Sequence, residues 1–361
     1  MLTTAVRRVL SRSEMRVPRV LFFACAVAAS SNGCASCAQS YLGIMPGTMN
    51  DPANRTLRRE ILSHGIGQFC GELQKHSAPL KLADDQPAIG RFFPTTCQMS
   101  EAKNGDLVVT LGGDGYAWTN LSKKVTFDMS GTIEYDQDFQ LDGSTMYAYF
   151  RTKTVSKNDF KTRAIENQIA NFVNQVSPIG DTFGRQLLSS ELQKGFTVIR
   201  DKDGNADFGL GVIDTGKRPL KPWDVHGANR ITYENTRSEI HQNERDFIGP
   251  IWIEDDGRAI WITATLDGVD AMDVIVLGKA DGEASLASYV QNASAGPLTG
   301  TPAFSDVVQN GAQYTKGVPL AKGVYYLIFD NSSTAGRVSP PVNLLDDRAA
   351  TVTYVVQIGD K

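Results

Sequence analysis

The sequence predicts an α+β domain followed by an all-β sandwich. Two stretches of the first half, residues 50–73 and 159–194, carry apolar residues at helical spacing, and the segments between them alternate as strands do. The last third of the chain is a series of short strand-like runs separated by turns such as Asp-Gly. We therefore expect two long amphipathic helices on an antiparallel sheet over residues 50–216, a proline-containing linker over 217–228 and a sandwich over 229–361.

The first 38 residues have the features of an export signal and its processing region. Arg16 and Arg19 precede an apolar run over residues 20–29, and small residues follow it. A start at Met15 would give this signal ordinary proportions. The apolar run is shorter than the roughly 18 residues that a membrane-spanning helix needs. We expect an exported protein, with residues 39–49 as a short tether.

Two processing routes are open. Cys34 after Gly33 resembles the bacterial lipobox, whose cysteine is acylated and becomes the mature N-terminus, although Ser31 stands where that motif usually carries an aliphatic residue. Residues 36–38 fit ordinary signal peptidase instead. Cleavage there leaves an even pair of cysteines, whereas acylation leaves Cys37 as an odd thiol. The sequence thus predicts either an outer-membrane protein with an acyl anchor, facing the periplasm or the surface, or a secreted one.

Cys70 and Cys97 are the cysteines outside the processing region. An oxidising compartment favours a disulfide between them. In the chain-entropy model, a loop of this length contributes about 3 kcal/mol to the free energy of unfolding. Two separate buried thiols are the alternative.

The elements of the first domain follow from local patterns. Asp51 and Pro52 suit the start of the first helix, as N-cap and first-turn proline. Strands are expected at 107–111, 116–118 and 145–154, with residues 112–115 as a hairpin turn between the first two. Strict alternation predicts a further strand with an apolar and a wet face. Its apolar face carries Val125, Phe127, Met129, Ile133 and Tyr135, opposite Thr126, Asp128, Ser130, Thr132 and Glu134.

A second helix is expected over residues 159–194, broken or kinked near Pro178 and stopped at Gly195. Two strand-like runs, 196–199 and 208–213, then flank a hairpin turn. Oxygen-bearing side chains in and around that turn are weak calcium candidates, although they lack the loop pattern of an EF-hand. They are Asp201, Asp203, Asn205 and Asp207.

The C-terminal strands carry one family resemblance. Residues 320–331, a glycine turn followed by a Tyr-rich strand that ends in Asp330 and Asn331, resemble the penultimate strand of GOLD-type and related bacterial secreted β-sandwich modules. The resemblance covers about a tenth of the chain. It implies a sandwich fold and a non-catalytic module for protein interaction or accessory binding, and it transfers no binding residue.

Charge and motif content exclude several functions. Residues 1–33 hold five Arg and one Glu, so removing them takes the formal net charge from −4 to −8. An acidic chain does not suit nucleic-acid binding, which needs a basic face. The sequence has no activated-serine elbow, and its four histidines form no zinc-protease motif. These are His64, His76, His226 and His241.

Three functions therefore remain open. We expect a non-enzymatic envelope or secreted protein that needs no cofactor and has an envelope protein or a lipid as its partner. The first alternative is a lipid carrier with a hydrophobic groove between the helices and the sheet of the first domain. The second alternative is a secreted hydrolase whose catalytic residues form no recognisable motif.

Overall fold

The structure, a computed structural model, describes seven stretches of the chain. The export signal, the tether up to residue 45 and Cys34 lie outside them. Within them, strands dominate and form one sheet of eleven strands and a second of four. The described residues are 46–83, 85–120, 123–166, 193–202, 206–225, 230–340 and 349–361.

The expected first helix is instead a chain of short helical pieces. Asp51 caps the start, and its carboxylate accepts a hydrogen bond from the Ala53 amide at 2.9 Å. The pattern is interrupted where Gly65 and Gly67 follow each other closely, because glycine is a poor helix former. The pieces are α4 (Pro46–Met49), η1 (Pro52–Asn54), α5 (Arg55–Gly65), η2 (Ile66–Gln68) and α6 (Phe69–Leu73).

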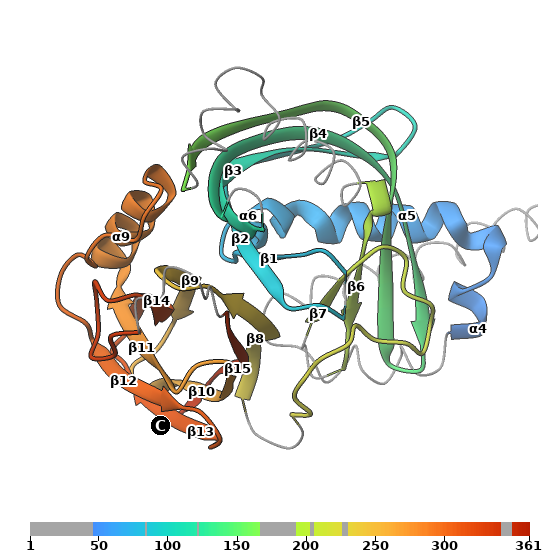
Figure 1. The fold of residues 1–361 in the computed structure, drawn as a ribbon. Coiled ribbons are helices and arrows are strands. Elements are labelled where there is room, and N and C mark those ends of the chain that lie inside the picture. Colours follow the sequence, from blue (N-terminus) through green and yellow to red (C-terminus); the bar gives the residue numbers. More distant parts are fainter. Residues whose placement is uncertain are drawn as a thin grey trace, which may run out of the picture.

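The first half is built on a curved antiparallel meander. Its strands follow one another in sequence and in space from β2 to β7, and β1 pairs with the other edge of β2. Figure 1 shows α5 running beneath the arch of β3, β4 and β5. The strands are β1 (Ala78–Lys81), β2 (Ala88–Glu101), β3 (Leu107–Thr119), β4 (Lys123–Asp142), β5 (Thr145–Ile165), β6 (Phe196–Arg200) and β7 (Ala206–Leu210).

Two expected elements of this half are wrong, namely the second helix and the hairpin turn at residues 112–115. Residues 159–165 continue β5 and pair with β4 up to Val125↔Ile165, so no helix starts at residue 159; residues 167–192 lie outside the described part. Residues 112–115 lie inside β3 and make no turn. The glycines there allow close packing, since a Cβ on Gly115 would stand 2.4 Å from the Phe127 ring. The α+β assignment with two long helices is therefore wrong, and the fold is β-rich.

The second half folds as two facing layers. One layer is the order β13-β10-β15-β8 at the end of the large sheet, and the other is β12-β11-β14-β9. The strands are β8 (Arg230–Ile240), β9 (Glu244–Ile253), β10 (Arg258–Asp267), β11 (Ala271–Gly278), β12 (Phe304–Gln309), β13 (Tyr314–Pro319), β14 (Gly323–Asn331) and β15 (Ala350–Asp360).

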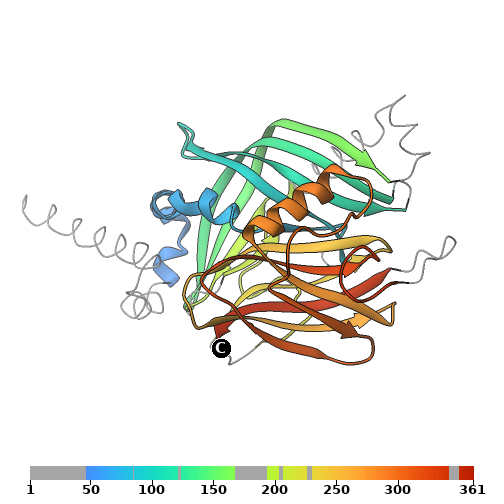
Figure 2. The same cartoon turned by 90° about the vertical axis from the view of Figure 1, so that its left-hand side faces the viewer.

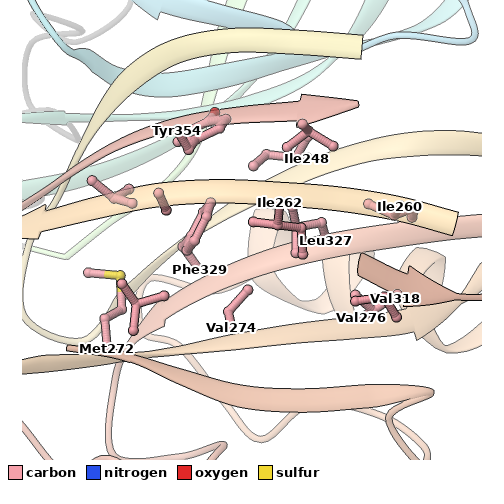
Figure 3. Packing of buried hydrophobic residues seen from close by; sticks show 14 of the residues in the cluster. Ile248, Ile260, Ile262, Met272, Val274, Val276, Val318, Leu327, Phe329 and Tyr354 are labelled. Atoms are coloured by element: carbon pink, nitrogen blue, oxygen red, sulfur yellow. The ribbon is translucent and has the colours of Figure 1, made fainter. Parts of the chain in front are cut away.

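Apolar side chains from both layers form a single core. Figure 3 shows Ile262 of one layer among Val274, Leu327 and Phe329 of the other, all of them buried. Tyr354 of β15 joins this core with its ring, whose centroid lies 5.1 Å from that of Phe329. Its hydroxyl donates a hydrogen bond to Glu234 of β8.

A helix that the sequence pattern did not predict interrupts these strands. α9 (Lys279–Gln291) lies between β11 and β12 in sequence and contacts β11 and β14 as well as β3, β4 and β5. In Figure 2 it lies between the strands of the two halves. It buries small residues such as Gly282 and Ser285 beside Tyr289 and Val290. Its sequence therefore lacks the regular apolar stripe that predicts a helix.

The two halves share the large sheet. β8 pairs with β2 through one parallel bridge, Ala88↔Ser238, and this bridge links the meander to the sandwich layer. The expected linker lies between them in sequence, and its described part, residues 217–225, contains neither helix nor strand. β2 also contacts β9, so it meets strands of both sandwich layers.

Candidate functional site

A buried ionic group lies where the two halves meet. Arg91 of β2 has no exposed surface and reaches between β8 and β9. It donates to both carboxylate oxygens of Asp246 at 2.9 Å and to both of Glu234 at 2.8 Å. Ser77 accepts a further hydrogen bond at 3.1 Å. A guanidinium suits this place because its planar fork matches two carboxylates at once.

Hydroxyl groups complete the cluster. Tyr354 donates to Glu234 at 2.7 Å, Tyr116 donates to Asp246 at 2.9 Å, and Ser238 donates to the same carboxylate at 2.7 Å. Burial opposes the charged form of Asp246, but Arg91 and these donors outweigh it and lower the pKa of that carboxyl group. The same carboxylates hold the pKa of Arg91 well above its usual range against its own burial. We call this set the Arg91 cluster.

A lysine makes a second contact between the halves. Lys124 of β4 is 1% exposed, and its Nζ donates to the carbonyl oxygens of Tyr289 and Asn292 at 2.8 and 3.0 Å, at the C-terminus of α9. It also lies 3.3 Å from the centre of the Tyr289 ring. Cations stabilise helix C-termini, where carbonyl groups lack partners within the helix. Burial lowers the pKa of Lys124 to about 7.

A polar groove opens on the face of the meander opposite α5. Along β4, Asp128 and Ser130 alternate with Phe127 and Met129, which pack inward. The groove has a volume of about 630 Å³. We call it the outer-face groove; its lining comes from Thr95, Thr96, Gly112, Gly113, Asp114, Asp128, Met129, Ser130, Asp159, Phe160, Lys161 and Arg163.

Two carboxylates and one guanidinium form the centre of this groove. Asp114 and Asp128 are direct cross-strand partners on β3 and β4. Arg163 of β5 donates from Nε to Asp128 at 2.6 Å, and its Nη2 lies 2.8 Å from Asp114. Partial burial and a hydrogen bond with Asp128 raise the pKa of Asp114. Asp128 has a lowered pKa, because hydrogen bonds from Arg163 and Asp114 outweigh its burial.

The floor of the groove depends on Gly112. A Cβ at this position would stand 2.8 Å from the Thr96 hydroxyl and 3.4 Å from the Ser130 Cβ, on the same side of the sheet. A side chain there would crowd the Thr96 and Ser130 side chains that line the groove. Asp114 is the cross-strand partner of Phe93. The Phe93 side chain packs in one buried cluster with Tyr289 of α9.

The structure joins Cys70 of α6 and Cys97 of β2 in a disulfide with a Cα–Cα distance of 5.3 Å. This bond ties the helical segment to the meander. Of the calcium candidates, Asp203 and Asn205 lie outside the described residues. Asp207 forms ion pairs with Arg218 and Lys221, so two cations already occupy its carboxylate.

Each histidine of the described stretches has a different partner. His64 is exposed and bonds to the Glu60 carbonyl, and the His76 ring packs at a tilt against Tyr233. His226 lies outside the described residues. His241 stacks on Trp118 with ring centres 3.4 Å apart. No group of three or more His, Cys, Asp or Glu in the described stretches is arranged to hold a metal ion.

The space between α5 and the sheet is packed with side chains. Leu62 and Ile66 contact a buried cluster that includes Ile133, Phe150 and Phe196. This packing gives the lipid-carrier alternative no support within the part of the chain that the structure describes. None of the helices found there is both long and apolar enough to cross a membrane.

Comparison with known proteins adds no relative: no protein-family model matches the chain, and no curated protein matches its sequence. The pattern of the sequence pointed to Asp128 and Ser130 only as the wet face of a strand. It gave no sign of Asp114 or Arg163, because the register that brings β3, β4 and β5 together is not visible in local sequence.

Proposed function

We propose that the chain is a non-enzymatic protein of the cell envelope or the secreted fraction, which acts by binding through a rigid β-scaffold. The Arg91 cluster is the observation that carries this proposal. It commits a fully buried arginine and its two carboxylate partners to holding the two halves together, and each charge there is satisfied by another protein group. A catalytic centre instead needs reactive groups that a substrate can reach.

The leader and the disulfide support the exported location. A basic segment, an apolar run and small residues precede Cys34, and the disulfide between Cys70 and Cys97 suits an oxidising compartment. Acylation of Cys34 would anchor the protein to a membrane, and cleavage after Ala38 would release it. The partner is then an envelope component that meets the scaffold from outside.

One observation favours a hydrolase as the second candidate. Asp114 and Asp128 form a hydrogen-bonded carboxyl pair in an open groove, and such pairs sharing a proton serve acid–base catalysis in aspartic proteases. In this groove, however, Arg163 binds both carboxylates. A guanidinium between them takes the place where a reactive water would be held.

Two measurements test the proposal. Intact-mass analysis of the protein from its native host should show a mature N-terminus at Cys34 with an acyl adduct, or at Gln39 without one. A full-length chain retained in the cytoplasm would contradict export. Purified protein should not turn over model peptide, ester, glycoside or phosphoester substrates, whereas turnover that Asp128→Asn abolishes would establish the hydrolase.

A further inference from the structure

We propose that the outer-face groove binds a neutral saccharide, with Asp114, Asp128 and Arg163 as the polar groups that recognise its hydroxyls. The saccharide could belong to a polysaccharide or to the sugar head of a lipid, because the chemistry of recognition is the same. This inference rests on the proposed function as a non-enzymatic binding protein and names the class of ligand.

The first argument is that the groove breaks a local rule of sheet stability. Like charges directly opposite each other on neighbouring strands are destabilising, yet Asp114 and Asp128 occupy such a pair of positions. The fold gains no core packing from them, since both carboxylates lie on the face away from the buried Phe127 and Met129. The ion pairs with Arg163 offset this repulsion, and residues that break a local rule in this way are expected at functional sites.

The second argument is that the polar groups are held in place and remain reachable. Arg163 from a third strand bonds to both carboxylates and fixes their orientation. The side chains of Asp114, Asp128 and Arg163 are about one third exposed, at 31%, 38% and 30%. A carboxylate accepts from two hydroxyl groups and a guanidinium donates from several N–H groups, so the cluster can pair with neighbouring hydroxyls of a sugar ring.

The third argument is the shape and the rest of the lining. Gly112 leaves the floor open where any side chain would meet Thr96 and Ser130. Hydroxyl groups of Thr95, Thr96 and Ser130 line the same groove and can both donate and accept. An array of mixed donors and acceptors around an open floor suits a ligand that is itself rich in hydroxyls.

The charge of the groove selects a neutral ligand. Its lining contains three acidic residues and two basic ones, which leaves it close to balance. A phosphate or nucleic-acid ligand would meet three carboxylates. A polycation would have to replace Arg163 and Lys161, which already lie on the acidic groups or beside them. A neutral polyol is not repelled by the carboxylates and does not have to replace a basic side chain.

The test measures binding of the full mature protein to a panel of neutral oligosaccharides, namely glucans, mannans, galactans and chitooligosaccharides, by glycan array and then by calorimetry. Spermine and inorganic phosphate serve as cationic and anionic probes. Ser130→Trp blocks the groove without removing an ion pair. Thr132→Trp places the same side chain two residues further along the same face of β4, outside the groove, and is the matched control.

We expect at least one neutral oligosaccharide to bind, Ser130→Trp and Asp128→Asn to weaken that binding at least tenfold, and Thr132→Trp to leave it unchanged. Thermal unfolding of each variant shows whether it is folded. Absence of binding across the panel, binding that Ser130→Trp leaves intact, or binding of spermine or phosphate alone would overturn the saccharide assignment. Failure of the saccharide assignment would not bear on export or on the lack of turnover. The mass and substrate measurements test those two properties separately.

Discussion

Arg91 and Asp246 lie 155 positions apart in sequence and form a bidentate ion pair, with both contacts at 2.9 Å. One residue belongs to the meander and the other to the sandwich, and both are buried. An ion pair withdrawn from water stabilises a structure only when its remaining hydrogen-bonding capacity is satisfied. Glu234, Ser77, Ser238 and the two tyrosines meet that condition here.

Removing Arg91 should therefore weaken the whole protein. Arg91→Met leaves Asp246 and Glu234 buried without their cation, and breaking a buried pair in this way costs about 3–5 kcal/mol. Urea unfolding measures the change in the free energy of unfolding. The control is Lys217→Met, which breaks the exposed Lys217–Asp214 pair and should change it by less than about 1 kcal/mol. Equal effects of the two substitutions would contradict the structural role of the Arg91 cluster.

Lys124 should make stability depend on pH. Burial lowers its pKa from 10.5 to about 7 in the folded state, so between these values the unfolded chain binds the extra proton. The free energy of unfolding then rises as pH increases from 7 towards 9. In Lys124→Met this rise should disappear. Urea titrations at pH 7, 8 and 9 compare the two proteins, and parallel curves would show that Lys124 keeps its ordinary pKa.

Asp330 should act in the opposite direction at lower pH. Burial raises its pKa from 3.8 to about 6, against the attraction of Arg245 at 3.0 Å. Between these two values the folded state binds the extra proton, so lowering the pH from 6 to 4 increases this residue's contribution to stability. Asp330→Asn removes the titration. The difference in unfolding free energy between wild type and variant should thus change over this interval, and a constant difference would be evidence against the shift.

Gly115 tests the packing inside β3. A Cβ there would stand 2.4 Å from the Phe127 ring, so Gly115→Ala should cost about 1–3 kcal/mol through overpacking. Gly131→Ala in the neighbouring strand is the matched control, because its Cβ would meet only the Lys157 carbonyl at 3.4 Å. If the two variants lose the same stability, the close approach of β3 to Phe127 is not what requires glycine.

The disulfide should contribute measurably to stability. Cys70 and Cys97 are 27 positions apart, and closing such a loop is worth about 3 kcal/mol in the chain-entropy model. The double variant Cys70→Ala with Cys97→Ala should lower the free energy of unfolding by about that amount. Reduction of the wild type should have the same effect as the double variant. If reduction changes nothing, the bond is not formed in the mature protein.

Local sequence predicted strands better than it predicted their partners. The alternation from Val125 to Tyr135 identified the two faces of β4, and the runs around Phe196 and Phe208 do form an antiparallel hairpin. The glycines of residues 112–115 predicted a turn because glycine favours turns, yet in β3 the same residues allow close packing. Local patterns cannot separate these two uses.

The candidate site depends on contacts that no local pattern contains. In the sequence, nothing distinguishes Arg91 from other polar residues. Its role depends on the fold, which places Glu234 of β8 and Asp246 of β9 beside it. The carboxyl pair of Asp114 and Asp128 exists only through the register of β3 on β4. Ile165 lies in the range where the second helix was expected, although it ends β5 opposite Val125, because a few apolar residues fit either period.

Differential scanning calorimetry of the mature protein tests most directly whether the two halves form one rigid scaffold. A body joined by the Arg91 cluster and by Lys124 should unfold in one transition, with equal calorimetric and van't Hoff enthalpies. Arg91→Met should lower the midpoint or split the transition into two. Two separate transitions in the wild-type protein would contradict the rigid scaffold on which the proposed function rests.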